Sequence, residues 1–267
     1  MQRFFEDWTT EKMAEARADL PGVVPILPLA AMESHGPHLP LGTDAILARE
    51  MVYLVDERAD DDWPGVFLPV QNFGVSTEHT HFAGTIDLGW RTMGETIFAI
   101  GRSLERAGFT KMALVNAHGG NAAMMGQISV DLRAKTGLLA ATCSWLRFGF
   151  PDGLLPAGEI SDGIHGGAVE TSLMLHFRPD LVHFERMGVF HSRQAEMREE
   201  NRYLTAHGRL GFGWMSDDLN PAGVVGDSSL AEPEIGRAIA EHQADAFITF
   251  IDEVAAFDVA RRIGDQP

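Results

Sequence analysis

Apolar and polar positions along the chain follow two periods, and together they predict alternating strands and helices. Short apolar runs such as Met112-Ala113-Leu114-Val115 are continuous, which is typical of strands buried on both faces. Between these runs, apolar residues recur three or four positions apart, as they do on one face of a helix. The pattern predicts strands at residues 23–31, 66–70, 111–116 and 138–145, and helices at residues 43–58, 93–107, 122–136, 168–176 and 233–257.

Strands that alternate with helices indicate crossover connections between parallel strands. We therefore expect an α/β fold with helices on both faces of a mostly parallel sheet. Residues 180–231 contain scattered glycine, proline and charge without a long period, and we expect an irregular excursion there that covers one end of the sheet. A length of 267 residues fits one large domain or two small ones. The unbroken alternation favours a single domain over residues 1–267.

Composition narrows the functional classes. The formal net charge is −17, which argues against nucleic acid or an anionic membrane as a partner, because both attract basic surfaces. The single cysteine, Cys143, cannot form an internal disulfide, and this suits a reducing compartment. The first residues lack the pattern of an export signal, and no apolar run is long enough to span a bilayer. We expect a cytoplasmic protein that does not enter a membrane.

Three loops contain the residues that could carry out chemistry. Two of these loops follow a predicted strand, and the third leads into the helix predicted at residues 168–176. Ligands of open α/β sheets bind beyond the carboxyl ends of the strands, so these loops are the expected site. Alternate residues of an extended segment project to the same side, which aims Glu33 and His35 at one point, and Asp44 enters from the start of the next helix. The three segments are Glu33-Ser34-His35-Gly36-Pro37-His38, Asn116-Ala117-His118-Gly119-Gly120-Asn121 and His165-Gly166-Gly167-Ala168-Val169-Glu170.

Imidazoles and carboxylates in this mixture suit Zn²⁺, Mn²⁺ or Fe²⁺, whereas calcium would require more oxygen ligands. Each residue also has a simpler structural interpretation. Asp44 is an ordinary helix-starting residue, and Glu170 would complete the first turn of its helix. The loop with Glu33 and His35 would otherwise be solvated, and His118 would precede a plain glycine turn.

Taken together, these segments resemble the signature blocks of the creatininase (creatinine amidohydrolase) family. Two further segments add to the resemblance, which runs from about residue 23 to residue 257. They are His81-Phe82-Ala83-Gly84-Thr85-Ile86 and Gly223-Val224-Val225-Gly226-Asp227. The resemblance implies a three-layer α/β/α sandwich that assembles as a homo-oligomer, with a hexamer favoured. It also implies hydrolysis of a non-peptide C–N bond in a small, often cyclic amide by a metal-activated water.

The resemblance further implies two divalent ions per chain, with zinc or manganese favoured and iron(II) as a third option. By position in the motifs, one ion would bind Glu33, Asp44 and His118, and the other would bind His35, Asp44 and Glu170, so that Asp44 is shared. His165 matches the catalytic histidine of the family. His38, Glu78 and His79 are candidates for outer positions around the metals or the substrate.

Two departures from creatininase itself bear on the substrate and the ligands. Creatininase has a glutamate two residues beyond the histidine that matches His118, whereas this chain has Gly120, and Glu170 is expected to replace it. Creatininase also encloses its ring with tryptophans that residues 156–164 lack; the nearest one here is Trp145. Creatinine is therefore a doubtful substrate. The alternatives are a deformylase, an enzyme that trims a modified peptide, or a metal-binding protein without turnover.

Overall fold

A four-stranded parallel sheet forms the centre of the computed structural model, which describes residues 2–258 and 260. Residues 1, 259 and 261–267 of the predicted domain lie outside the described residues. The strand order is β2-β1-β3-β4, and each neighbouring pair is parallel. The strands are β1 (Val24–Leu29), β2 (Gly65–Phe67), β3 (Lys111–Asn116) and β4 (Leu139–Ser144). The predicted α/β fold with a mostly parallel sheet is confirmed.

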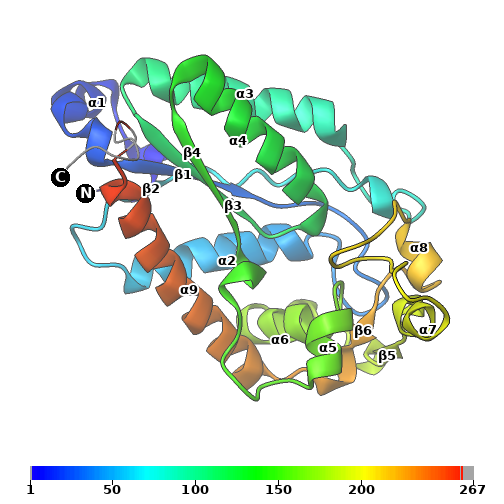
Figure 1. The fold of residues 1–267 in the computed structure, drawn as a ribbon. Coiled ribbons are helices and arrows are strands. Elements are labelled where there is room, and N and C mark those ends of the chain that lie inside the picture. The colour runs from blue at the N-terminus through cyan, green and yellow to red at the C-terminus, as the bar shows by residue number, and fades with distance from the viewer. Residues whose placement is uncertain (1, 259, 261–267) are drawn as a thin grey trace.

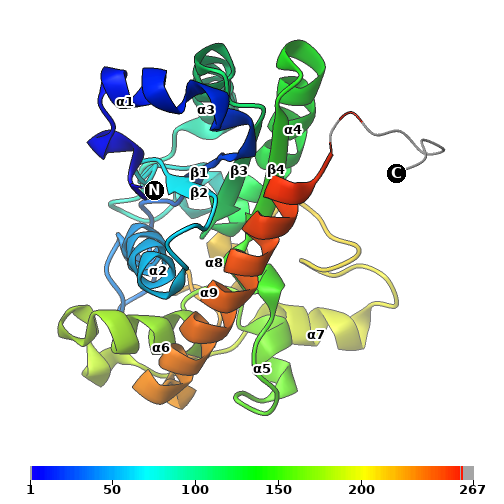
Figure 2. The same ribbon diagram turned by 90° about the vertical axis from the view of Figure 1, so that its left-hand side faces the viewer.

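Helices cover both faces of this sheet, as Figures 1 and 2 show. One face carries α2 (Thr43–Arg58), α6 (Ala168–Phe177) and α9 (Pro233–Ala256); the other carries α3 (Gly89–Ala107) and α4 (Ala122–Thr136), with α1 (Thr10–Glu15) near the C-terminal end of α3. Adjacent strand residues face opposite layers: Ile26 packs in the core beside α2, α6 and α9, whereas Leu27 packs in the core beside α3 and α4. This three-layer arrangement explains why the strands are continuously apolar.

Two boundaries differ from the sequence prediction by more than two residues. The second strand ends at Phe67, three residues early. The Leu68 amide still donates to the Ile26 carbonyl at 2.8 Å, but the next such bond comes from the Gln71 amide to the Pro28 carbonyl at 2.9 Å, so one extra residue interrupts the pairing with β1. Helix α3 begins at Gly89, four residues before the predicted start, and the Asp87 carboxylate accepts the amide hydrogen bond of Gly89 at 2.9 Å. That side chain satisfies a donor which the first turn of a helix otherwise leaves free.

Residues 180–231 contain only short strands and α-helices. These are the antiparallel pair β5 (Val189–Phe190) and β6 (Gly226–Asp227), with α7 (Arg193–Glu200) and α8 (Ser216–Leu219) between them. Val225, just before β6, pairs with His165, which follows the short helix α5 (Ala157–Asp162). The excursion therefore lies directly against the loop that contains His165.

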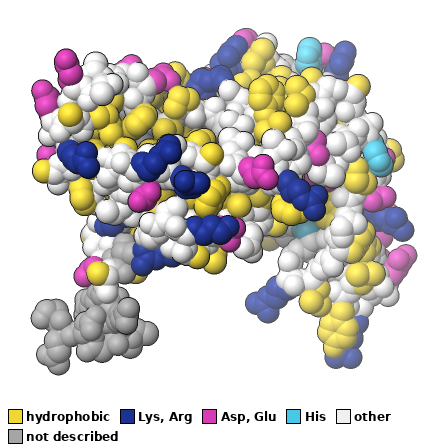
Figure 3. All heavy atoms as spheres, turned by 90° about the horizontal axis from the view of Figure 1, so that it is seen from above, with side chains coloured by type: hydrophobic (Ala, Val, Ile, Leu, Met, Phe, Trp, Pro, Cys, Tyr) yellow, Lys and Arg dark blue, Asp and Glu magenta, His cyan; other side chains and the backbone are white. Residues whose placement is uncertain are grey.

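Within the described ranges, no helix combines the length and the apolar composition that crossing a bilayer requires. On the face seen in Figure 3, hydrophobic, acidic and basic side chains are interspersed.

Candidate metal centre

Four of the predicted ligands come from segments that follow β1 and β3. Glu33 and His35 lie in the loop after β1, Asp44 is the second residue of α2, and His118 follows β3. The carboxyl ends of parallel strands meet at one edge of the sheet, so these side chains converge. All four are buried, with Glu33 fully inaccessible to solvent.

Asp44 lies between two imidazoles. Its Oδ1 is 3.3 Å from His35 Nε2, and its Oδ2 is 3.5 Å from His118 Nδ1. The side chain does not cap α2, whose N-cap residue is Gly42, and Oδ2 has no hydrogen-bond partner. The helix-start interpretation therefore does not account for the carboxylate, whose two oxygens face two separate nitrogen ligands.

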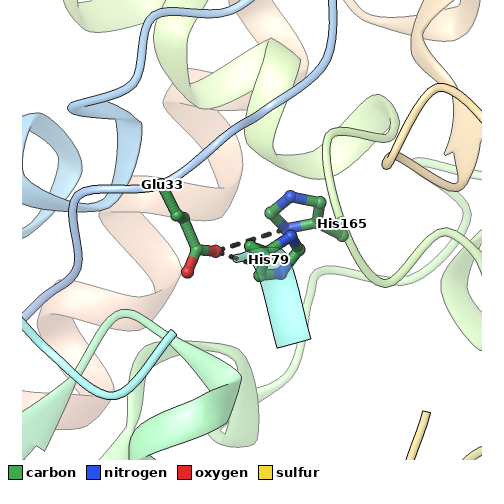
Figure 4. A group of neighbouring side chains, drawn as sticks. All are labelled: Glu33, His79 and His165. Atoms are coloured by element: carbon green, nitrogen blue, oxygen red, sulfur yellow. Dashed lines mark ion pairs between the residues drawn. The ribbon is translucent and has the colours of Figure 1, made fainter. Parts of the chain in front are cut away.

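Glu33 stands at the centre of a second set of imidazoles, two of which are drawn in Figure 4. Its Oε1 is 3.2 Å from His118 Nδ1, 3.4 Å from His79 Nε2 and 3.7 Å from His165 Nδ1. The sequence indicated His79 only as an outer residue, yet the structure places its ring against this carboxylate. The rings of His35 and His79 also contact the ring of His165, each tilted against it, at 43° and 35°, with a centroid separation of 4.2 Å.

Backbone carbonyls fix the orientation of three imidazoles. His35 Nδ1 lies 3.3 Å from the Glu33 carbonyl, His118 Nε2 lies 2.7 Å from the Val75 carbonyl, and His165 Nε2 lies 2.8 Å from the Ser34 carbonyl. A carbonyl only accepts hydrogen bonds, so in each ring this nitrogen carries the proton. The other nitrogen of each ring faces the carboxylates, and when neutral it could present its lone pair to a metal ion held between them, as metal-ligating histidines do.

Glu170 is a less central member of the cluster. Its Oε2 accepts a hydrogen bond from the Gly166 amide and lies 3.9 Å from His35 Nε2. Part of the carboxylate thus serves the first turn of α6, as the simpler interpretation suggested. The same oxygen nevertheless faces the side of His35 that Asp44 approaches, so Glu170 can complete a ligand set there.

Without a metal ion, the positive and negative side chains of the cluster compensate one another. Burial opposes protonation of His35, but the carboxylates of Asp44, Glu170 and Glu33 raise its pKa to about 10. His118 has its pKa raised to about 10 in the same way, chiefly by Glu33 and Asp44 against the effect of burial. Burial itself raises the pKa of Glu170 to about 7. The cluster therefore attracts positive charge strongly, whether as protons or as metal ions.

The unpaired polar atoms fit divalent cations. Both oxygens of Glu33, His35 Nε2 and Asp44 Oδ2 are buried without a hydrogen-bond partner, although burying such atoms unpaired is costly. Three overlapping groups place one ligand atom of each member within 4.8 Å of the others: Glu33 with His79 and His165, His35 with His165 and Glu170, and Glu33 with His35 and Asp44. Imidazole and carboxylate ligands at this spacing suit zinc, manganese or iron(II).

Several polar residues position these ligands without joining them. His38 Nε2 contacts the Gly166 carbonyl at 3.0 Å and the Thr171 hydroxyl at 3.1 Å, so it supports the loop with His165. The Asn116 side-chain carbonyl accepts a hydrogen bond from the His118 backbone amide at 3.2 Å, and another from the side-chain amide of Asn121. We did not predict a role for either asparagine, although both lie in the segment that drew attention to His118.

Comparison with known proteins identifies the family of this chain. The family model for creatinine amidohydrolase, named Creatininase, matches residues 6–251. The chain belongs to the creatininase family. A mycofactocin precursor peptide peptidase of Mycobacterium ulcerans (strain Agy99) is 31% identical over 241 residues, covering 88% of this chain and 87% of that protein. A creatinine amidohydrolase of Pseudomonas putida is 30% identical over 195 residues, covering 67% of this chain and 73% of that protein.

Solved structures extend the likeness to the whole fold. A crystal structure of creatinine amidohydrolase (creatininase) matches with a TM-score of 0.78 and 25% identity, covering 96% of this chain and 99% of that chain. Two other creatininase structures, each 25% identical with a TM-score of 0.74, are described as a Zn–Zn type and a manganese form. The predicted creatininase-like sandwich is confirmed.

Two adjacent glycines provide a test of how tightly His118 is held. A Cβ at Gly120 would lie 2.5 Å from both His118 Nε2 and Glu78 Oε1 and would also collide with the Val75 carbonyl, whereas a Cβ at Gly119 would have no neighbour within 4 Å. We expect Gly120→Ala to displace His118 and weaken zinc binding by about 10-fold or more, the range that supporting residues of metal sites show. Gly119→Ala is the matched control. Equal zinc affinities for the two variants, measured by competition with a chromophoric chelator, would contradict the assignment of His118 as a ligand.

Proposed function

We propose that this protein is an amidohydrolase that uses two divalent metal ions, with zinc or manganese favoured, to cleave a C–N bond of a small, cyclic amide. The observation that supports two ions is the Asp44 carboxylate, whose oxygens face His35 at 3.3 Å and His118 at 3.5 Å. A carboxylate with one ligand nitrogen beyond each oxygen is suited to bridging two cations. Glu33 and His118 would complete one set, and His35 and Glu170 the other.

When bound, such ions polarise an amide carbonyl and lower the pKa of water, so that water attacks at neutral pH. The protein contributes the proton transfer. The Ser34 carbonyl holds the Nε2 proton of His165, which leaves Nδ1 facing Glu33 Oε1 at 3.7 Å. Burial, together with the neighbouring imidazoles of His35 and His79, keeps the pKa of His165 well below its usual range.

A neutral His165 can accept a proton at Nδ1 and then deliver it to the nitrogen that leaves. The C–N bond breaks as a C–O bond forms to the water oxygen, and the products are a carboxylate and an amine. The rings of His35 and His79, each 4.2 Å from the ring of His165, restrict its rotation. The residue is therefore oriented before substrate arrives.

Creatinine is not the substrate that the structure favours. Trp145 is the tryptophan nearest in sequence to residues 156–164, where creatininase has its ring-enclosing tryptophans. It is 4% exposed and packs against Phe247 in the core, with a centroid separation of 4.8 Å. It does not replace the tryptophans that enclose creatinine in creatininase. A panel of creatinine, hydantoins, cyclic imides, formamides and short peptides tests the proposed class, and turnover of a cyclic amide alone is the expected result.

A second candidate is cleavage of a modified peptide. The similarity to a mycofactocin precursor peptide peptidase covers more of the chain than the similarity to creatinine amidohydrolase, 88% against 67%. Both reactions hydrolyse an amide with the same cluster. Turnover of short peptides but no cyclic amide in the panel would favour this candidate.

We also propose that the enzyme is a cytoplasmic homo-oligomer, with a hexamer favoured, that binds neither nucleic acid nor membranes. Multi-angle light scattering is expected to give six times the chain mass of 29.2 kDa. A monomer at micromolar concentration would contradict this assembly.

Binding of zinc to the metal-free protein is expected to release protons. Zinc requires neutral histidine ligands. Without metal, carboxylates oppose burial and raise the pKa values of His35 and His118 to about 10, and burial raises the pKa of Glu170 to about 7. At pH 7 we expect about two protons per chain from the imidazoles, plus a fraction from Glu170. The apparent affinity should rise as pH increases toward 10, because fewer protons must be displaced.

Calorimetric titration with zinc in buffers of different ionisation enthalpy measures this release. An observed enthalpy independent of the buffer would contradict the charge state assigned to the cluster. The same titration predicts a thermal effect: free zinc at 100 times its dissociation constant adds about 2.7 kcal/mol of stability, or roughly 5–10 °C for a chain of this size.

A further inference from the structure

Glu159 is a buried carboxylate outside the metal cluster, and it links two segments that hold His165. It lies on α5 and is 8% exposed. Its Oε1 accepts the amide hydrogen bond of Ala168 at 2.7 Å, and its Oε2 accepts that of Asp227 at 2.8 Å. Ala168 is the first residue of α6, and Asp227 belongs to β6. None of the ion pairs among the described residues involves Glu159. Both oxygens of the carboxylate instead accept hydrogen bonds from backbone amides.

The surrounding sequence leaves space for this carboxylate. A Cβ at Gly163 or Gly167 would collide with Glu159 Oε1, and a Cβ at Gly226 would lie 2.8 Å from it. Any side chain at these three positions would have to displace the carboxylate or the backbone. Gly163 and Gly167 flank His165 on both sides in sequence.

His165 is therefore enclosed by contacts that converge on Glu159. The Val225 amide donates to the His165 carbonyl at 2.9 Å, and Val225 lies two residues before Asp227. The N-cap residue of α6, Gly167, has no side chain to cap the helix, and Glu159 supplies the missing acceptor. Negative charge at this end is also favoured by the helix dipole. Glu170 lies in the first turn of the same helix.

We propose that Glu159 is a positioning residue for catalysis: it fixes the 163–168 loop and the start of α6, and so sets the position of His165 relative to Glu33. Its hydrogen bonds to Ala168 and Asp227 are charge-assisted, which makes them strong. The kinetic part of the proposal rests on the proposed amidohydrolase function. The structural part concerns the orientation of His165 and does not require turnover.

Glu159→Gln tests the proposal in the zinc-loaded protein. The amide nitrogen of glutamine would face one of the two N–H donors, so one hydrogen bond is lost while the shape is kept. We expect kcat to fall by about 10-fold or more with KM and zinc content unchanged, because a small misplacement of a reacting group has effects of this size. Carbethoxylation of His165, followed by mass spectrometry, should become faster relative to His242.

Asp162→Asn is the matched control, because it removes the same charge from the same helix while its side chain contacts Ser161 and Arg198. It should leave both readouts unchanged. If Glu159→Gln alters neither kcat nor His165 modification, or accelerates the modification of all histidines together, the positioning role is wrong. If Glu159→Gln does not fold, Glu159→Asp decides by the same readouts, since it keeps the charge but is one methylene too short to reach both donors. Should no amide in the panel be hydrolysed, the proposed function fails, and the modification rates still test Glu159.

Discussion

Replacing Asp44 with alanine is expected to remove at least one metal ion per chain and to lower kcat/KM by about 1,000-fold or more. Asp44 faces both His35 and His118, so its loss opens both ligand sets at once. The loss of several kcal/mol of charge stabilisation in the transition state corresponds to a rate effect of this order. Metal analysis of the purified variant and the rate on the best substrate of the amide panel measure the two effects.

Asp56→Ala is the matched control for this variant. Asp56 lies on the same helix, α2, and its carboxylate is 3.6 Å from Arg3 rather than near the cluster. An ion pair of this kind contributes little to stability, so metal content and rate should match the unmodified protein. If Asp44→Ala retained full metal content and activity, Asp44 would not be a shared ligand.

Replacing His165 with alanine is expected to lower kcat by about 100-fold to 10,000-fold, the usual contribution of a general acid or base. We expect two metal ions to remain, because Glu33, Asp44 and His118 on one side and His35 with Glu170 on the other do not depend on His165. The measurements are kcat, KM and metal content of the same preparation. His242→Ala, which changes an exposed histidine on α9 whose ring contacts the Phe148 carbonyl, serves as the control.

Metal content separates two roles for His165. The residue also belongs to two of the three groups of possible metal ligands. Loss of an ion in His165→Ala would assign it as a ligand and contradict its role as the proton carrier. Unchanged turnover with both ions retained would show that another group moves the proton.

Long elements of the fold could be predicted from the sequence because their patterns are local. The β3 strand follows the continuous apolar run at residues 112–115, and α9 follows Pro233 and its helical spacing, so their predicted positions agree with the structure to within one residue. Short elements such as α1 and α5 escaped prediction, because six residues are too few to show a period. Strand β2 is shorter than predicted because one extra residue between Leu68 and Gln71 interrupts its pairing with β1, and the local apolar pattern does not show this break.

The site was predictable where residues follow strands, and less so where distant packing positions them. Glu33, His35, Asp44 and His118 converge because parallel strands place their loops at one edge. His79 lies in a short turn after Val75. The Asn121 side chain accepts a hydrogen bond from the Val75 backbone amide at 2.9 Å, and this contact helps bring the segment to the cluster. No local pattern encodes that contact. Glu159 was missed for the same reason, since its two partners are 9 and 68 residues away in sequence.

The central claim is that five side chains hold two divalent ions, and anomalous X-ray diffraction tests it most directly. Crystals grown with zinc and measured on both sides of the zinc absorption edge would show each ion as a separate peak. We predict two peaks, one on each side of the Asp44 carboxylate: the first between Glu33 and His118, the second between His35 and Glu170. A single peak, or peaks that do not contact Asp44, would contradict the shared two-metal centre.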